Sequence, residues 1–157
     1  MLKVLVADDH PIVREGLKRL IEDEFDSAVV HESSYARDAM EAIRTQSWDI
    51  AILDINFPDQ NGLEVLKRIK EKFPQLPVII LSSEEGLEVS ANIIKFGAFD
   101  YIVKDDNAFG RLEIVLKNAM EQTQLKKDVG SQRQVAFILM IIIVVLFIAG
   151  LIERFFF

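Results

Sequence analysis

Residues 4–17 read VLVADDHPIVREGL, an apolar run that stops at two aspartates and then changes its period. Leu2–Ala7 is rich in branched apolar residues, which is typical of a buried strand. From Pro11 onward the apolar residues recur three and four positions apart, and proline is favoured at the first position of a helix. The stretch therefore predicts a strand followed by a helix, with Asp8 and Asp9 at the carboxyl end of the strand.

The same strand-and-helix unit recurs four more times before residue 124. Continuous apolar strands that alternate with amphipathic helices are typical of a parallel sheet covered by helices on both faces. We therefore expect an α/β fold, a doubly wound sheet of five parallel strands, over residues 1–124. The further strands are predicted at Ala28–Val30, Ile50–Leu53, Val78–Leu81 and Tyr101–Val103, and the further helices at Tyr35–Arg44, Gly62–Lys72, Leu87–Phe96 and Asn107–Gln124.

Charge is distributed unevenly along the chain. Residues 1–123 carry 14 Lys and Arg against 23 Asp and Glu, a net −9, whereas residues 124–157 carry 4 against 2, a net +2. An acidic domain is a poor ligand for the phosphates of nucleic acid, and no basic recognition helix follows residue 124. Nucleic acid is therefore not expected as a partner. The chain has no Cys, which excludes disulfides and thiolate chemistry.

Polar side chains stand where four of the predicted strands end: Asp8 and Asp9, Asp54, Ser82 and Lys104. Ligands of open parallel sheets bind at that edge of the sheet. Three carboxylates brought together repel one another, and a hard cation with oxygen ligands, such as Mg²⁺, relieves the conflict. A cation, an ammonium and a hydroxyl also suit the oxygens of a phosphoryl group. Asp54, alone on the middle strand, is then the candidate nucleophile for an aspartyl phosphate.

Four stretches carry a resemblance to a known family: VLVADDHPIVREGL, ILDINFPDQNGLEVL, VIILSS and FGAFDYIVKD. In this order and spacing they resemble the receiver domain of bacterial two-component response regulators, over about residues 1–123. The DDHP opening is similar to receivers that usually carry a helix-turn-helix output domain. The resemblance implies a flavodoxin-like fold that takes a phosphoryl group from a sensor histidine kinase with the help of Mg²⁺.

The resemblance also implies a role for each matching residue. It makes Asp54 the phosphoacceptor, Ser82 the switch hydroxyl, Tyr101 the switch aromatic and Lys104 the lysine that pairs with the phosphate. It implies that Asp9, Asp54 and the backbone carbonyl of Asn56 bind Mg²⁺, with Asp8 acting through water. Taken singly, several of these residues have plainer roles, since Asp8 or Asp9 could cap the following helix and Tyr101 could fill the core. Neither His10 nor His31 belongs to a set with ligand spacing, so both are expected to be structural or exposed.

Two further positions bear on the lifetime and the output of the phosphorylated state. Asn56 and Glu84 lie where the family tunes hydrolysis, and polar residues at both positions favour a lifetime of minutes or less. In the family, the face of the fourth helix, fifth strand and fifth helix dimerises or docks partners. A phosphorylation-dependent dimer and an unknown protein effector are therefore expected as partners.

The last part of the chain has a different composition. Fourteen of the eighteen residues of Val135–Ile152 are Leu, Ile, Val or Phe, and eighteen helical residues rise about 27 Å against a hydrocarbon core of about 30 Å. We expect a polar linker at 125–134, a transmembrane helix at Val135–Ile152 and a short far-side tail at 153–157. Basic residues before the apolar run place the receiver in the cytoplasm, so the expected location is the cell inner membrane, crossed once. The alternatives are a helix buried in an oligomer and the remnant of a truncated output domain.

The expected function is therefore a membrane-tethered receiver and not an enzyme that acts on metabolites. It would accept a phosphoryl group from a sensor histidine kinase and signal through protein–protein contact. Two alternatives remain open: a phosphate sink that drains a membrane kinase, and a membrane scaffold that acts independently of phosphate.

Overall fold

Strands and helices alternate along the whole chain. The computed structural model describes the backbone of residues 1–156 and the side chains of residues 1–86, 88–126, 129 and 132–145. The strands are β1 (Leu2–Ala7), β2 (Ala28–Ser33), β3 (Ile50–Asp54), β4 (Val78–Ser82) and β5 (Asp100–Val103). The helices are α1 (Pro11–Glu24), α2 (Ala36–Thr45), α3 (Gly62–Lys72), α4 (Leu87–Lys95) and α5 (Ala108–Phe156).

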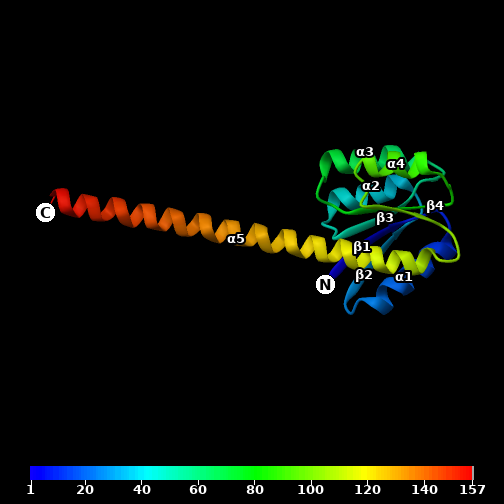
Figure 1. Cartoon of the computed structure of the whole chain (residues 1–157), viewed down its shortest axis with the longest axis horizontal. Helices are drawn as coiled ribbons and strands as arrows, with labels where there is room; N and C mark the ends of the chain where they lie inside the picture. Colours follow the sequence, from blue (N-terminus) through cyan, green and yellow to red (C-terminus); the bar gives the residue numbers. More distant parts are fainter. Residues whose placement is uncertain (157) are drawn as a thin grey trace. The chain divides into compact units, whose positions relative to one another are not determined.

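The five strands form one parallel sheet in the order β2-β1-β3-β4-β5. Helices α2, α3 and α4 cover one face, and α1 with the first turns of α5 covers the other (Figure 1). The predicted doubly wound α/β fold of five parallel strands is confirmed. Strand order reverses between β1 and β3, and the carboxyl ends flanking such a switch point are where this class of sheet binds ligands.

Successive residues of each central strand point to opposite faces of the sheet, and both faces are apolar. Leu53 and Ile80 face the cluster that includes α2 and α3, whereas Ile52 and Ile79 face the cluster that includes α1 and α5. Both β3 and β4 are buried along their full length, as expected for strands covered on both sides. The two apolar layers fix the height at which the central strands end, and therefore where their terminal polar side chains lie.

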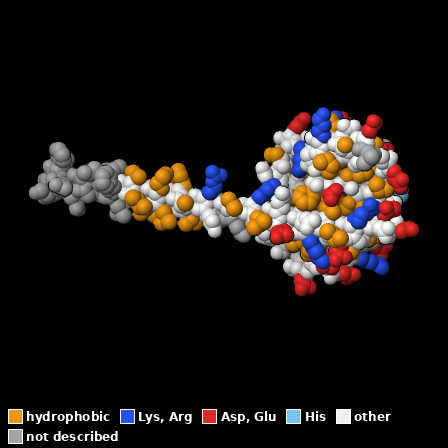
Figure 2. Space-filling view, in the orientation of Figure 1, with side chains coloured by type: hydrophobic (Ala, Val, Ile, Leu, Met, Phe, Trp, Pro, Cys, Tyr) orange, Lys and Arg blue, Asp and Glu red, His pale blue; other side chains and the backbone are white. Residues whose placement is uncertain are grey.

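Helix α5 continues through residues 125–134, where a polar linker was expected. The segment contains no proline, and its Gln, Lys and Arg residues are good helix formers, so the single Gly130 does not end the helix. The chain divides into two compact units, Met1–Met120 and Glu121–Phe157. In the second unit the described apolar side chains from Val135 to Val145 are exposed, and they appear as an orange stretch in Figure 2.

The prediction of a single-pass inner-membrane protein is wrong for the part of the chain that the structure describes. Among those residues, no helix is both long and apolar enough to cross a membrane. The side chains of residues 135–145, the first part of the predicted segment, are described. The remainder of the predicted segment, residues 146–152, and the far-side tail at 153–157 lie outside the described side chains.

Candidate functional site

The carboxyl ends of β1, β3 and β4 each place a polar side chain in an otherwise apolar interior. Asp8, Asp54 and Ser82 are 1%, 2% and 0% exposed. Asp54 is the last residue of β3, and Ser82 is the last residue of β4. Buried carboxylates are costly unless they are paired, so the fold keeps these acids at the sheet edge only with a partner close by.

That partner is Lys104, which directly follows β5. Its ammonium lies 2.6 Å from Asp8 Oδ2 and donates a hydrogen bond of 2.8 Å to Asp54 Oδ2. Burial by itself lowers the pKa of Lys104, but the hydrogen bonds to Asp54 and Asp8 and the attraction of both carboxylates outweigh burial and raise it above the ordinary value. Lys104 is therefore a cation held between two buried acids.

The second oxygen of Asp54 is held by the backbone that follows it. Asp54 Oδ1 accepts hydrogen bonds from the N–H groups of Ile55, at 2.7 Å, and Asn56, at 3.2 Å. The loop then closes through a bridge between Asn56 and Asn61. Gly62 follows, and a Cβ there would lie 2.5 Å from the carbonyl oxygen of Asp54. The glycine thus lets the start of α3 approach the acid closely enough to fix the loop around it.

The alternative role of Asp8 or Asp9 as a side-chain cap of helix α1 is not what the structure shows. Helix α1 has His10 at its N-cap with no side-chain capping bond. Asp8 Oδ1 instead accepts a hydrogen bond of 2.9 Å from the backbone N–H of His10, and Arg14 donates to the backbone carbonyl of Asp8. Both contacts hold Asp8 at the sheet edge.

His10 is exposed, as expected, but the sequence analysis missed its contacts with the two aspartates. Its Nδ1 lies 2.7 Å from Asp9 Oδ1 and 3.1 Å from Asp8 Oδ1, although its side chain is 65% exposed. The signal available in the sequence was its position directly after the two aspartates. The absence of a spaced histidine partner was not informative, because the acids themselves supply the partners.

The acidic residues fit a hard divalent cation. Asp8, Asp9, His10 and Asp54 each offer one ligand atom, and these atoms lie within 4.8 Å of one another. A few carboxylate oxygens are the protein ligands that suit Mg²⁺, which keeps several of its own water ligands. The predicted ligands Asp8, Asp9 and Asp54 are thus brought together. The role of the Asn56 carbonyl stays a prediction, with Asn56 placed directly beside Asp54.

The predicted switch residues are linked through the loop after β4. Ser82 Oγ accepts a hydrogen bond of 3.1 Å from the backbone N–H of Glu84. The hydroxyl of Tyr101 donates a hydrogen bond of 2.6 Å to the backbone carbonyl of the same residue. Tyr101 also packs against the core cluster beside α4. A movement of Ser82 would therefore be transmitted to Tyr101 through Glu84, whose backbone contacts both side chains.

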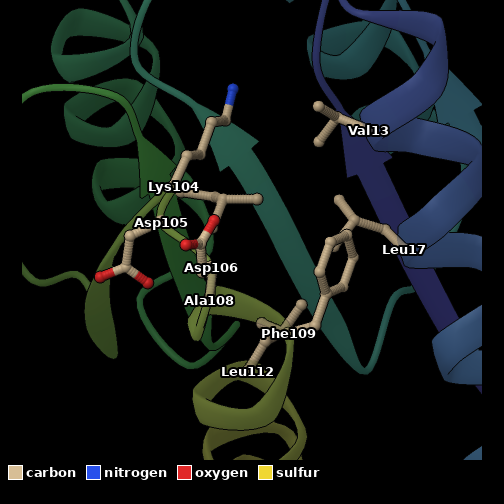
Figure 3. A pocket seen from close by; sticks show the side chains of 9 residues that line it. Val13, Leu17, Lys104, Asp105, Asp106, Ala108, Phe109 and Leu112 are labelled. Carbon is tan, nitrogen blue, oxygen red and sulfur yellow. The ribbon is translucent and has the colours of Figure 1, made fainter.

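A small cavity of about 260 Å³ opens beside Lys104, between α1 and the start of α5 (Figure 3). The ring of Phe109 lies against α1, where it would be 3.0 Å from a Cβ at Gly16, and Val13 and Leu17 of α1 line the cavity beside it. Asp105 and Asp106 line the same cavity near Lys104. The cavity therefore connects an apolar surface to the charged site.

Comparison with known proteins identifies the class to which this fold and site belong. Residues 4–116 match the response regulator receiver domain family, and the chain belongs to that family. Receiver domains accept a phosphoryl group on an aspartate, interact with sensor histidine kinases and can form dimers. The predicted resemblance is confirmed.

Particular relatives agree with this assignment. The chain is 34% identical over 133 residues to the DNA-binding transcriptional activator DevR/DosR of Mycobacterium tuberculosis. The aligned region covers 85% of this chain and 56% of the relative. It is also similar to TrrA of Thermotoga maritima, solved in complex with Mg²⁺ and BeF (TM-score 0.68, 28% identity, covering 76% of this chain and 99% of that one). A beryllofluoride-activated NtrC4 receiver domain dimer matches with a TM-score of 0.72 and 26% identity, covering 78% and 99%.

The chain spans only part of the length of the curated relatives that it matches, about half of DevR/DosR and about a quarter of a Proteus hauseri NtrC. Both relatives are named as DNA-binding regulators. The comparisons therefore do not support the expectation that nucleic acid is no partner.

Proposed function

We propose that this receiver takes a phosphoryl group from a sensor histidine kinase onto Asp54 and reports it through a change of protein–protein contact. The observation that carries the proposal is the pairing of the 2%-exposed Asp54 with Lys104 at the switch point of the sheet. The same end of the sheet holds Asp8 and Asp9, whose oxygens complete a donor set for Mg²⁺. The proposed acceptor, its lysine partner and the proposed metal ligands therefore lie together at one end of the sheet.

Transfer would form an O–P bond at a carboxylate oxygen of Asp54 as the N–P bond of the donor phosphohistidine breaks. The electron pair of that bond returns to the imidazole, which takes up a proton. Lys104 then has phosphoryl oxygens to bind in place of the carboxylate that it contacts now. Mg²⁺, when bound, would supply further positive charge for the same oxygens.

The new phosphoryl group would change the loop after β4. It adds about −1.5 to −2 charges, and Lys104 and the hydroxyl of Ser82 are donors at the ends of the two following strands. A displaced Ser82 releases the N–H of Glu84, whose carbonyl holds Tyr101. The face formed by α4, β5 and α5 is therefore the proposed output surface, for an effector or for a second copy of the chain. We propose no catalysis on small-molecule metabolites.

The proposal is tested with beryllofluoride, a mimic of the phosphoryl group, observed by ¹⁹F NMR on the full chain. We expect a bound signal only when Mg²⁺ is present, and we expect Asp54→Asn to abolish it. Asp106→Asn is the matched control and should keep the signal, because this exposed carboxylate follows Lys104 by two residues but contacts none of the acids. A bound signal that survives Asp54→Asn would rule out Asp54 as the acceptor.

A phosphate sink is the second candidate function, and it is favoured by the polar residues Asn56 and Glu84. Either side chain can orient an attacking water, which gives the expected phosphoryl lifetime of minutes or less. An Asn56→Met, Glu84→Tyr double variant should then lose its phosphoryl group more slowly. A partner that is captured only by the beryllofluoride-bound chain supports signalling output, whereas rapid turnover with no such partner supports the sink. A scaffold independent of phosphate requires that Asp54→Ala leave the phenotype intact.

A further inference from the structure

A second hollow lies away from the phosphoacceptor residues, between α2 and α3. Its volume is about 640 Å³. None of the acids around Asp54, nor Ser82 or Lys104, lines it. Its wall is formed by Arg37, Met40, Glu41 and Arg44 of α2, Arg68 and Lys72 of α3, and Gln60 of the loop that precedes α3.

The hollow concentrates positive charge in an acidic part of the chain. Four of its lining side chains are cations and one, Glu41, is an anion, whereas residues 1–123 together carry a net −9. Arg37 and Arg44 lie two helical turns apart on α2, and Arg68 and Lys72 lie one turn apart on α3. Each helix therefore presents a stripe of cations to the same space.

Seven cations elsewhere in the described residues pair with carboxylates. Lys67 pairs with Glu64 at 2.8 Å, and Lys117 pairs with Glu113 at 2.8 Å. Around the hollow, in contrast, Arg44 and Lys72 form no ion pair with any described carboxylate.

The other two cations are only partly engaged. Arg68 donates to the neutral Oε1 of Gln60 at 3.2 Å, and Arg37 pairs with Asp38, which does not line the hollow. Cations that face each other across a groove repel, and the repulsion disappears when an anion binds between them.

We propose that this hollow binds a small ligand that carries two or more phosphate groups. Guanidinium groups bind phosphate through two parallel hydrogen bonds, and cations on both walls can bind separate phosphates of one ligand. The volume lies within the range of about 300–1,000 Å³ that is usual for small-molecule sites. Met40, which is half-buried, adds an apolar contact. The ligand is either an inorganic polyphosphate or a nucleoside polyphosphate, and this site is independent of Asp54.

Isothermal titration calorimetry on the full chain in a metal-chelating buffer tests the proposal with orthophosphate, tripolyphosphate and ATP. We expect tripolyphosphate to bind at least about tenfold more tightly than orthophosphate, because one ligand then engages both walls. ATP that binds more tightly than tripolyphosphate identifies a nucleotide site, and equal affinities identify an inorganic one. Asp54→Asn should leave binding unchanged, and a loss of binding in that variant would assign the anion to the phosphoacceptor site and overturn the proposal.

Charge variants separate a built site from general attraction. Arg44→Glu with Arg68→Glu should weaken tripolyphosphate binding by more than about tenfold, and Arg44→Gln with Arg68→Gln should act in the same direction. Arg19→Glu with Lys95→Glu changes the net charge of the chain equally at exposed positions outside the hollow, and should alter affinity by less than about twofold. Equal weakening in the two Glu pairs, or no binding of tripolyphosphate to the unaltered chain, would overturn the proposal.

Discussion

Lys104 is the single residue on which the acidic site depends when no divalent cation is bound. Among the described residues, its ammonium is the only cation in ion-pair contact with both Asp8 and Asp54. Removing one partner of such a cluster leaves the others buried and unpaired, which costs more than the contact itself contributes. The same contacts also explain why the pKa of Lys104 is raised despite burial.

We predict that Lys104→Met lowers the free energy of unfolding by about 2 kcal/mol in chelating buffer. A raised pKa in the folded state means that the contribution of Lys104 is complete below its ordinary value and is lost only as pH rises through the raised one. The difference from the unaltered chain should therefore stay constant between about pH 7 and 9 in urea denaturation. Saturating Mg²⁺ should reduce this difference in the free energy of unfolding, because the bound metal ion neutralises the carboxylates that Lys104 otherwise pairs with. Lys95→Met is the exposed control, and a difference that Mg²⁺ leaves unchanged would contradict this account.

The principal site residues were predictable because each ends a strand. Asp8, Asp54 and Ser82 close apolar runs whose period is visible in the sequence, and Lys104 directly follows another. The hydrogen bond from Tyr101 to Glu84 could not be predicted, because it depends on the path of the loop after β4. The contacts of His10 were missed for a similar reason, since they follow from the backbone turn between β1 and α1.

Among the elements, the loop between β3 and α3 positions the acceptor and also begins a neighbouring helix. Helix α2 has no side-chain cap of its own, and the carboxylate of Asp59 accepts hydrogen bonds from the N–H groups of Ala36, at 3.1 Å, and Arg37, at 3.0 Å. Its slight desolvation raises the pKa of Asp59, but these backbone hydrogen bonds outweigh it and lower the pKa below the ordinary value. No sequence pattern marks this cap, because its two parts are more than twenty residues apart.

We predict that Asp59→Ala lowers the free energy of unfolding by about 1 kcal/mol at neutral pH, the usual effect of losing a helix cap. Because the pKa is lowered in the folded state, the stabilisation is present above the ordinary value of 3.8 and is lost as pH falls through the lowered one. Denaturation curves of the two chains should therefore converge in acid. Curves that keep the same separation at low pH would assign the effect to packing and not to the charge.

A substitution at Gly62 tests how tightly the loop between β3 and α3 is packed. A Cβ at this position would lie 2.5 Å from the Asp54 carbonyl oxygen and 2.5 Å from Ile55 Cα. Because both neighbours are backbone, Gly62→Ala should destabilise the chain by about 3 kcal/mol and weaken beryllofluoride binding. Gly110→Ala is the matched control in α5, where a Cβ meets nothing within 4 Å, and it should raise stability by no more than about 1 kcal/mol. A Gly62→Ala chain as stable as the control would show that the loop can move to accommodate the added Cβ, and would contradict the prediction.

Element boundaries were less predictable than element order. The strand predicted at Ala28–Val30 runs to Ser33, because it pairs with β1 along its whole length. This pairing compensates for a side-chain pattern in which His31 and Glu32 are exposed. The end of the last helix was also missed, since helix-forming residues continue where a polar linker was expected.

At the scale of the whole molecule, every residue of the proposed phosphoacceptor site lies in the compact unit Met1–Met120. The unit Glu121–Phe157 supplies none of them. Composition alone suggested that this second part spans a membrane, but among the described residues no helix is long and apolar enough to do so. The central claim about function therefore rests on the first unit, while the full chain remains the right material for its test.

The most direct measurement is the position of the phosphoryl group after the full chain reacts with acetyl phosphate. Intact mass is recorded with Mg²⁺ and with a chelator, and the acyl phosphate is then reduced and located by peptide mass mapping. We predict one added phosphoryl group, only with Mg²⁺, on Asp54, absent from Asp54→Asn and retained by Asp106→Asn. A phosphoryl group located on another residue, or one that persists in Asp54→Asn, would contradict the account.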